Sequence, residues 1–155
     1  MTPEDMWSNY LKLMNKNIQT KRSYDVWSFG TQADELADLV LKEKKTATTS
    51  LYYLYEIENE KLPEKGDIGI ITNSKGDAKC IIQTKQVDVL PFYEVTSDFA
   101  FKEGEGDRSL EYWRKVHIQF FENELKEINK AFSEDMLVVC EEFEMIYKLN
   151  HRSDT

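Results

Sequence analysis

The stretch "IGIITNSKGDAKCIIQTKQVDVL", residues 68–90, has the pattern of two β-strands joined by a tight turn. Apolar residues gather on both sides of the polar tetrapeptide SKGD at residues 74–77, and a glycine inside such a short polar segment is typical of a hairpin turn. The second apolar run extends to Leu90, which leaves room for a bulge. We therefore predict a pair of antiparallel strands at this point of the chain.

The flanking sequence adds further strands and helices. Strands are predicted at residues 46–55, where β-branched and aromatic residues dominate, and at residues 135–149. Helices are predicted after three capping signals, namely Thr2 with Pro3, Thr31 with Asp34, and Asp107. Four or so strands with three helices predict an α+β domain, built as a small partly open β-barrel or a curved, mostly antiparallel sheet with flanking helices.

Hydrophobic alternation within the strands predicts the residues of the core. The positions expected to face inward include Ile70, Ile81, Val139 and Phe143. A mainly helical or doubly wound parallel structure would contradict this reading of the pattern.

Length and charge limit the classes of partner. The chain has 155 residues, about the length of one domain, and a formal net charge of −9 at pH 7. Affinity for bulk duplex DNA rests on many Lys and Arg contacts to phosphates, so this acidic balance argues against such a partner. No apolar run approaches the ~20 residues of a membrane span, and the N-terminus lacks the pattern of a leader peptide, so we expect a cytoplasmic chain without a membrane partner. The sequence leaves the oligomeric state open.

Cysteine and histidine positions do not have metal-site spacing. Cys80 and Cys140 both lie in apolar strand-like runs without a C-x-x-C pattern. His117 falls on the apolar face of a predicted helix, and His151 lies in the polar C-terminal segment. We therefore predict two buried reduced thiols, no metal and no cofactor.

The segment "KEKKTATTS", residues 42–50, places lysines and hydroxyls side by side. In a strand, successive side chains alternate between faces, so Thr46, Thr48 and Ser50 would share one hydroxylic face. A half-exposed strand that uses threonine for its β propensity explains the same residues without a functional site. The pattern alone leaves both interpretations open.

The lysines of this segment favour the functional interpretation. Lys44 and Lys45 are adjacent like charges, and this crowding with partial burial would favour a neutral amine on one of them. A neutral lysine beside a threonine hydroxyl is a pair of base and nucleophile. Residues three apart in a regular strand point to opposite faces, so Lys45 and Thr48 can converge only if Lys45 still lies in the turn.

A second candidate segment is "FAFKEGEGD", residues 99–107. Glu103 and Glu105 alternate with Gly104 and Gly106, whose conformational freedom lets the backbone come close to a ligand. A flexible acidic loop that ends in a helix cap is the alternative explanation.

Taken together, the ordered motifs WSFG, KEKKTATTS, LPEKGD, CIIQTKQVDVLPFYEV, FAFKEGEGD and LEYWRKVH resemble the ASCH domain family, in particular its branch with KTAT and EGEGD signatures. The resemblance covers nearly the whole chain from Trp27 to Tyr147. It implies a PUA-like β-barrel and a role related to RNA or nucleosides. It also divides the chain into an N-terminal helical extension at 1–23, an ASCH domain at 24–149 and a disordered tail at 150–155.

Some small bacterial ASCH proteins are amidohydrolases that remove the acetyl group from 4-acetylcytidine. The resemblance carries their lysine, threonine and glutamate onto Lys45, Thr48 and Glu103, and we expect all three to lie outside the core. Binding of a small nucleoside-like ligand or a short RNA is expected to involve Lys44, Thr46, Ser50, Gly104, Glu105, Trp27 and Tyr53.

Two departures bear on the substrate, because Glu43 replaces a usual glycine and Ser50 replaces the arginine of the amidohydrolases. The alternative function is a non-catalytic RNA- or nucleotide-binding module that regulates translation or RNA processing, or a ribonuclease.

Overall fold

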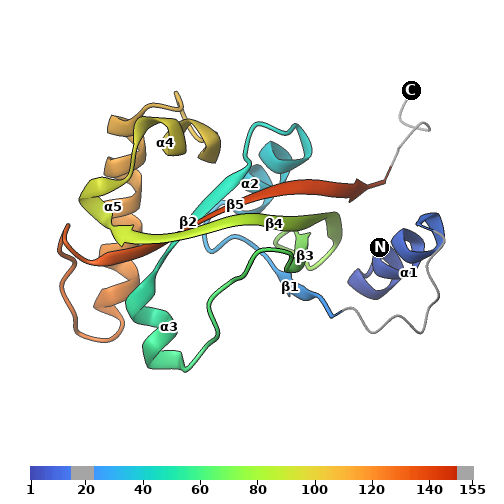
Figure 1. The fold of residues 1–155 in the computed structure, drawn as a ribbon, viewed down its shortest axis with the longest axis horizontal. Helices are drawn as coiled ribbons and strands as arrows, with labels where there is room; N and C mark the ends of the chain where they lie inside the picture. The colour runs from blue at the N-terminus through green and yellow to red at the C-terminus, as the bar shows by residue number, and fades with distance from the viewer. Residues whose placement is uncertain (15–22, 150–155) are drawn as a thin grey trace.

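The computed structural model describes residues 1–14 and 23–149 (Figure 1). The predicted tail at 150–155 lies outside the described residues. Within them, five strands form one curled sheet in the order β1-β3-β4-β5-β2. Their bounds are β1 Asp25–Trp27, β2 Ala47–Leu51, β3 Ile68–Thr72, β4 Ala78–Pro91 and β5 Leu137–Lys148. The sheet is a half-barrel, so the predicted α+β class with a curved sheet is confirmed.

The hairpin predicted at residues 68–90 is present as β3 and β4, which pair antiparallel. The side chain of Asn73 stabilises the turn by accepting hydrogen bonds from the backbone N–H groups of Lys75 and Asp77. The register of β4 against β5 shifts between Thr84 and Gln86, so the second strand does contain an irregularity. β1 pairs with β3 in parallel, which makes the sheet mixed.

Helices flank this sheet in the described part of the chain. They are α1 Pro3–Leu13, α2 Ala33–Leu41, α3 Tyr52–Glu58, α4 Ser97–Glu103 and α5 Leu110–Lys126, with a short 3-10 turn at Phe92–Glu94. In Figure 1, α1 lies beside one end of the sheet, and α4 and α5 lie together at the other end. None of the helices in residues 1–14 and 23–149 is long and apolar enough to cross a membrane.

The strand predicted at residues 46–55 is wrong in its second half, because Tyr52–Glu58 forms α3. β2 ends at Leu51, which pairs with Val138, and β5 begins only one residue before Val138. Beyond Leu51 the backbone therefore has no further part of β5 to pair with. Its N–H and C=O groups form the hydrogen bonds of α3 instead.

Two of the three predicted helix caps are also wrong. Ser109, not Asp107, caps α5 by accepting a hydrogen bond from the backbone N–H of Tyr112. Asp107 instead accepts from the backbone N–H of Ser109. Gln32, not Thr31, precedes α2, while the Thr2 cap of α1 is present as predicted.

The core is divided among three clusters that follow the helices around the sheet. The first packs α5 and the 3-10 turn against β2 and β5, the second packs α2 on β3, β4 and β5, and the third packs α1 on β3 and β4. All four predicted core residues, Ile70, Ile81, Val139 and Phe143, are buried. The first cluster is the one that supports the site described below.

The corrected cap of α5 gives the first testable prediction. Replacing Ser109 with alanine removes the capping oxygen and is expected to lower the free energy of unfolding by about 1 kcal/mol. Ser97→Ala is the matched control, because α4 is capped by the preceding residue Thr96. Urea unfolding of both variants tests the assignment, and equal losses would contradict it.

Candidate functional site

The carboxylate of Glu103 is the centre of a buried polar cluster. Its Oε1 accepts a hydrogen bond from Lys45 Nζ at 2.8 Å. Its Oε2 accepts from Thr49 Oγ1 at 2.5 Å and from Trp113 Nε1 at 2.6 Å, and lies 3.2 Å from His117 Nε2. The side chains of Lys45 and Glu103 are each only 1% exposed. The expectation that these two residues lie outside the core is therefore wrong.

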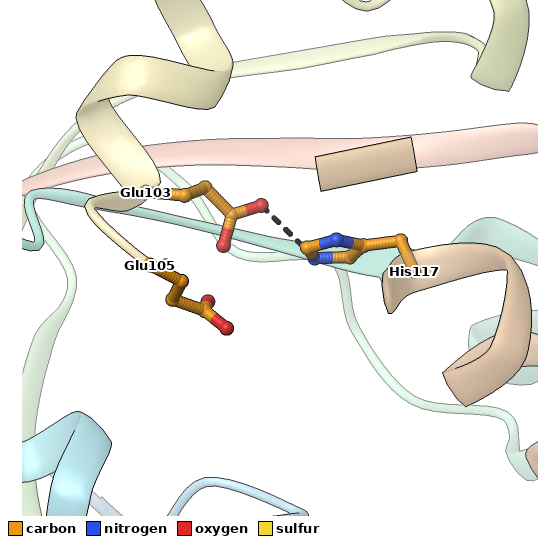
Figure 2. Close-up of side chains that lie close together, drawn as sticks. All are labelled: Glu103, Glu105 and His117. Atoms are coloured by element: carbon orange, nitrogen blue, oxygen red, sulfur yellow. Dashed lines mark ion pairs between the residues drawn. The ribbon is translucent and has the colours of Figure 1, made fainter. Parts of the chain in front are cut away.

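Four separate segments supply this cluster. Glu103 is the last residue of α4, Lys45 lies in the connection between α2 and β2, and Thr49 lies in β2 itself. Trp113 and His117 are four residues apart on α5 and so lie on the same face of that helix. Figure 2 shows the His117 ring facing Glu103 across the site, with Glu105 on the loop that follows α4.

Gly104 allows the α4–α5 loop to come close to the segment that carries Lys45. It has a φ of +74°, in the left-handed region, and a Cβ at this position would overlap the carbonyl oxygen of Lys44. Its own N–H donates to the carbonyl of Phe101, so that donor is engaged in ending α4. Gly104 therefore permits the close approach of these two segments, and it does not line the cavity.

Charge compensation keeps the cluster ionised despite its burial. Burial alone would raise the pKa of Glu103, but Lys45 and His117 hold this pKa below its ordinary value. Burial alone would lower the pKa of Lys45, but Glu103 and Glu105, the latter 3.0 Å from Nζ, raise it above its ordinary value. The neutral amine expected from crowding of Lys44 and Lys45 is thus wrong for this arrangement, in which Lys45 is an ammonium.

The cluster lines a cavity of about 1110 Å³. Thr48, Thr49 and Ser50 from β2 line the same cavity, and Ser50 Oγ lies 2.8 Å from the hydroxyl of Tyr55. Apolar and aromatic side chains complete its wall, namely Trp27, Phe29, Leu36, Leu54, Val116 and Phe120. A large cavity with apolar walls and a few convergent polar groups is the usual form of a small-molecule site.

Acidic side chains dominate the charge of this cavity. Beyond Glu103 and Glu105, its lining includes Asp25, Glu58, Glu60, Asp67, Glu124 and Glu141. Burial raises the pKa of Glu141, and burial together with Glu58 raises the pKa of Glu124. The cationic side chains of the lining are Lys45 and Lys61, with His117 when protonated. A phosphate group would therefore meet net repulsion here.

The three residues expected to be catalytic, Lys45, Thr48 and Glu103, all line one cavity, in which Lys45 and Glu103 are also hydrogen-bonded to each other. Ser50, Glu105 and Trp27 line it too. Four of the expected binding residues lie outside the lining, namely Lys44, Thr46, Gly104 and Tyr53. Tyr53 packs against the core, and the Thr46 hydroxyl donates a hydrogen bond to the Lys102 carbonyl.

Sequence reasoning missed Thr49, Trp113 and His117. Successive side chains of a strand alternate between faces, so Thr49 and Thr48 point to opposite faces of β2. Glu103 lies on the Thr49 face, where its carboxylate accepts a hydrogen bond from Thr49 Oγ1. The one available signal for the other two was their spacing of four residues on α5. A histidine on an apolar helix face is ordinarily a packed core residue, so the spacing alone did not single them out.

Glu103, Glu105 and His117 offer ligand atoms within 4.8 Å of one another, a set that in principle could hold a metal ion. The ammonium of Lys45 lies 2.8 Å and 3.0 Å from the same two carboxylates. It supplies the positive charge that a cation would bring, so we assign the group as an ion-pair cluster.

The curled sheet with flanking helices defines a PUA-like domain, and the cavity lies within it. A family model described as the ASCH domain matches residues 25–147, and the chain belongs to this family. No curated protein gave a significant match.

Solved structures agree with the family assignment. An ASCH domain from Lactobacillus crispatus JV V101 is 35% identical, with a TM-score of 0.87 and 93% of each chain covered. A protein from Enterococcus faecalis V583 is 33% identical, with a TM-score of 0.84 and coverage of 98% of this chain and 92% of the other. A further hypothetical protein is 25% identical, with a TM-score of 0.53, and covers 78% of this chain and 99% of its own.

The close approach at Gly104 gives a prediction about stability. Gly104→Ala is expected to cost about 1 kcal/mol for the positive φ and roughly 1–3 kcal/mol more for the overlap with Lys44. Gly76→Ala is the matched control, because Gly76 also has a positive φ, +84°, but its Cβ would meet nothing within 4 Å. Equal destabilisation of the two variants in urea would contradict the role assigned to Gly104.

Proposed function

We propose that this chain is an amidohydrolase that removes the acyl group from an uncharged nucleoside such as 4-acetylcytidine. The observation that carries the proposal is one cavity lined by both Thr48 and the buried Lys45–Glu103 pair. The family resemblance supports the same three residues. The cavity volume of about 1110 Å³ is ample for a nucleoside.

Lys45 must lose its proton before it can act as a base. Glu105 is the candidate acceptor, because its Oε2 lies 3.0 Å from Nζ and its side chain is 17% exposed, unlike that of Glu103. A substrate that fills the cavity removes water from this pair, and desolvation favours the neutral amine and carboxylic acid over the two ions. In this proposal substrate entry therefore activates the lysine.

The reaction then proceeds in two balanced steps. Neutral Lys45 takes the Thr48 proton as the Thr48 oxygen attacks the acyl carbonyl, and the C–N bond breaks as Lys45 returns that proton to the leaving amine. Water next attacks the acyl-Thr48 ester, with Lys45 again moving the proton. The products are the free nucleoside and a carboxylic acid, and Thr48 is regenerated.

Glu103 has a positioning role in this scheme. Its two carboxylate oxygens already accept hydrogen bonds from Lys45, Thr49 and Trp113. Because the pKa of Glu103 is lowered, its carboxyl group is ionised and has no proton to donate to a leaving amine. We therefore assign it to fixing the Lys45 amine beside the cavity.

Acidic residues in the cavity favour an uncharged substrate. Glu58, Glu124 and Glu141 line the cavity wall, and each ionised carboxylate there would repel a phosphate. The proposed substrate is therefore a free nucleoside, not a nucleotide or a residue within a long RNA strand.

The second candidate function is a non-catalytic module that binds RNA. Membership of the ASCH family favours it, because a role in RNA binding is attributed to these domains. The net charge of −9 and the acidic cavity lining weigh against binding through phosphates.

Turnover of 4-acetylcytidine is the test of the proposal. The wild-type chain should release cytidine and acetate, measured by chromatography, Thr48→Ala should abolish this activity, and Ser97→Ala, outside the cavity, should leave it intact. A 5′-phosphate on the substrate should lower kcat/KM at least about tenfold, equivalent to about 1.4 kcal/mol of repulsion.

Two outcomes would contradict the proposal. Full activity of Thr48→Ala would exclude the nucleophile, and absence of turnover combined with salt-sensitive retention of long RNA would favour the binding module.

A further inference from the structure

His117 has a hydrogen bond acceptor at each ring nitrogen. Its Nδ1 lies 2.9 Å from the backbone carbonyl oxygen of Trp113, and its Nε2 lies 3.2 Å from Oε2 of Glu103. A carbonyl oxygen and an ionised carboxylate can only accept, so both nitrogens must carry a proton for both contacts to be hydrogen bonds. A neutral imidazole has one N–H and satisfies only one of the two.

We propose that His117 is held as a doubly protonated imidazolium at neutral pH and is a second counter-cation of Glu103, which it shares with Lys45. It thereby acts as a positioning residue for the Lys45–Glu103 pair. Nothing in the family resemblance assigns this residue to the site.

The surroundings of His117 compensate the charge of a buried imidazolium. An uncompensated buried charge is costly, and the His117 side chain is only 10% exposed. Glu103 at the end of α4 and Glu105 on the following loop balance the two cations Lys45 and His117 one for one. The other acids that line the cavity are Asp25, Glu58, Glu60, Asp67, Glu124 and Glu141.

The indole of Trp113 adds a further favourable contact. Its ring stacks on the imidazole with centroids 4.3 Å apart and planes inclined by 20°. A cation over an aromatic face is stabilised by the ring quadrupole. Burial lowers the pKa of His117, but Glu103 and the Trp113 carbonyl outweigh this effect, and the pKa is raised above its ordinary value.

This charge state affects Lys45, a consequence that rests on the proposed function. Because Glu103 is shared by two cations, it attracts the Lys45 ammonium less effectively than it would alone. A neutral residue at position 117 would leave Lys45 as the sole cation beside two carboxylates and would raise its pKa further. His117 therefore assists the deprotonation that the amidohydrolase mechanism requires.

Nitrogen-15 NMR of the imidazole ring tests the charge state directly. The chain has two histidines, so His151→Gln leaves the signal of His117 alone. At pH 7.5 both ring nitrogens of His117 should be protonated, whereas a histidine of ordinary pKa would be only about 10% protonated. A neutral single tautomer at pH 7.5 would overturn the proposal.

The pH dependence of stability provides a second readout through His117→Gln. A raised pKa means that the stabilisation by His117 is complete below pH 6.5, the ordinary value, and is lost as pH rises through the pKa of the folded state. The urea midpoint of the wild type should therefore exceed that of His117→Gln most below pH 6.5, with a gap that narrows at higher pH. A gap that widens as pH rises would indicate a buried neutral histidine and contradict the proposal.

Activity measurements separate this proposal from the proposed function. If the chain hydrolyses 4-acetylcytidine, the rising limb of its pH–rate profile should move to higher pH in His117→Gln. An unmoved limb would refute the assistance to Lys45. Absence of turnover in the wild type would refute the proposed function alone, since the NMR and unfolding experiments decide the charge of His117 without it.

Discussion

The buried carboxylate of Glu103 is the interaction on which the site and its supporting elements depend. A carboxylate without partners at this depth would cost several kcal/mol, so the chain must deliver donors to it. Lys45, Thr49, Trp113 and His117 do so from a loop, a strand and a helix. The same contacts tie α4 and α5 to β2 at the end of the sheet, next to the core cluster that contains Trp113.

This constraint links stability to function more closely than a surface site would. Lys45 and Glu103 are core residues by burial, yet both line the cavity in which a ligand would bind. Thr48 has no comparable part in the cluster, because the neighbouring Thr49 provides the hydroxyl that Glu103 accepts. Replacement of the pair is therefore expected to affect folding, whereas replacement of Thr48 tests chemistry.

Local patterns predicted the hairpin and the core, while features set by tertiary contacts were missed. The β3–β4 hairpin follows from apolar runs on either side of a glycine-containing turn. The helix at Tyr52–Glu58 depends on where β5 begins, far along the chain, and its tyrosines have strand propensity. Lys45 and Glu103 were found through their motifs, but their burial could not be predicted, because charged side chains are buried only where distant partners compensate them. His117 illustrates the same limit, since only the packing of α5 shows which groups its ring meets.

A double-mutant cycle between Lys45 and Glu103 tests the central claim most directly. Lys45→Met and Glu103→Gln should each lower the free energy of unfolding by about 3–5 kcal/mol, because each leaves a buried charged group without its main partner. The double variant should lose clearly less than the sum, with a coupling energy of about 2 kcal/mol or more, and the same cycle between Lys45→Met and Thr48→Ala should give about zero. Additive losses for Lys45→Met and Glu103→Gln would contradict the account.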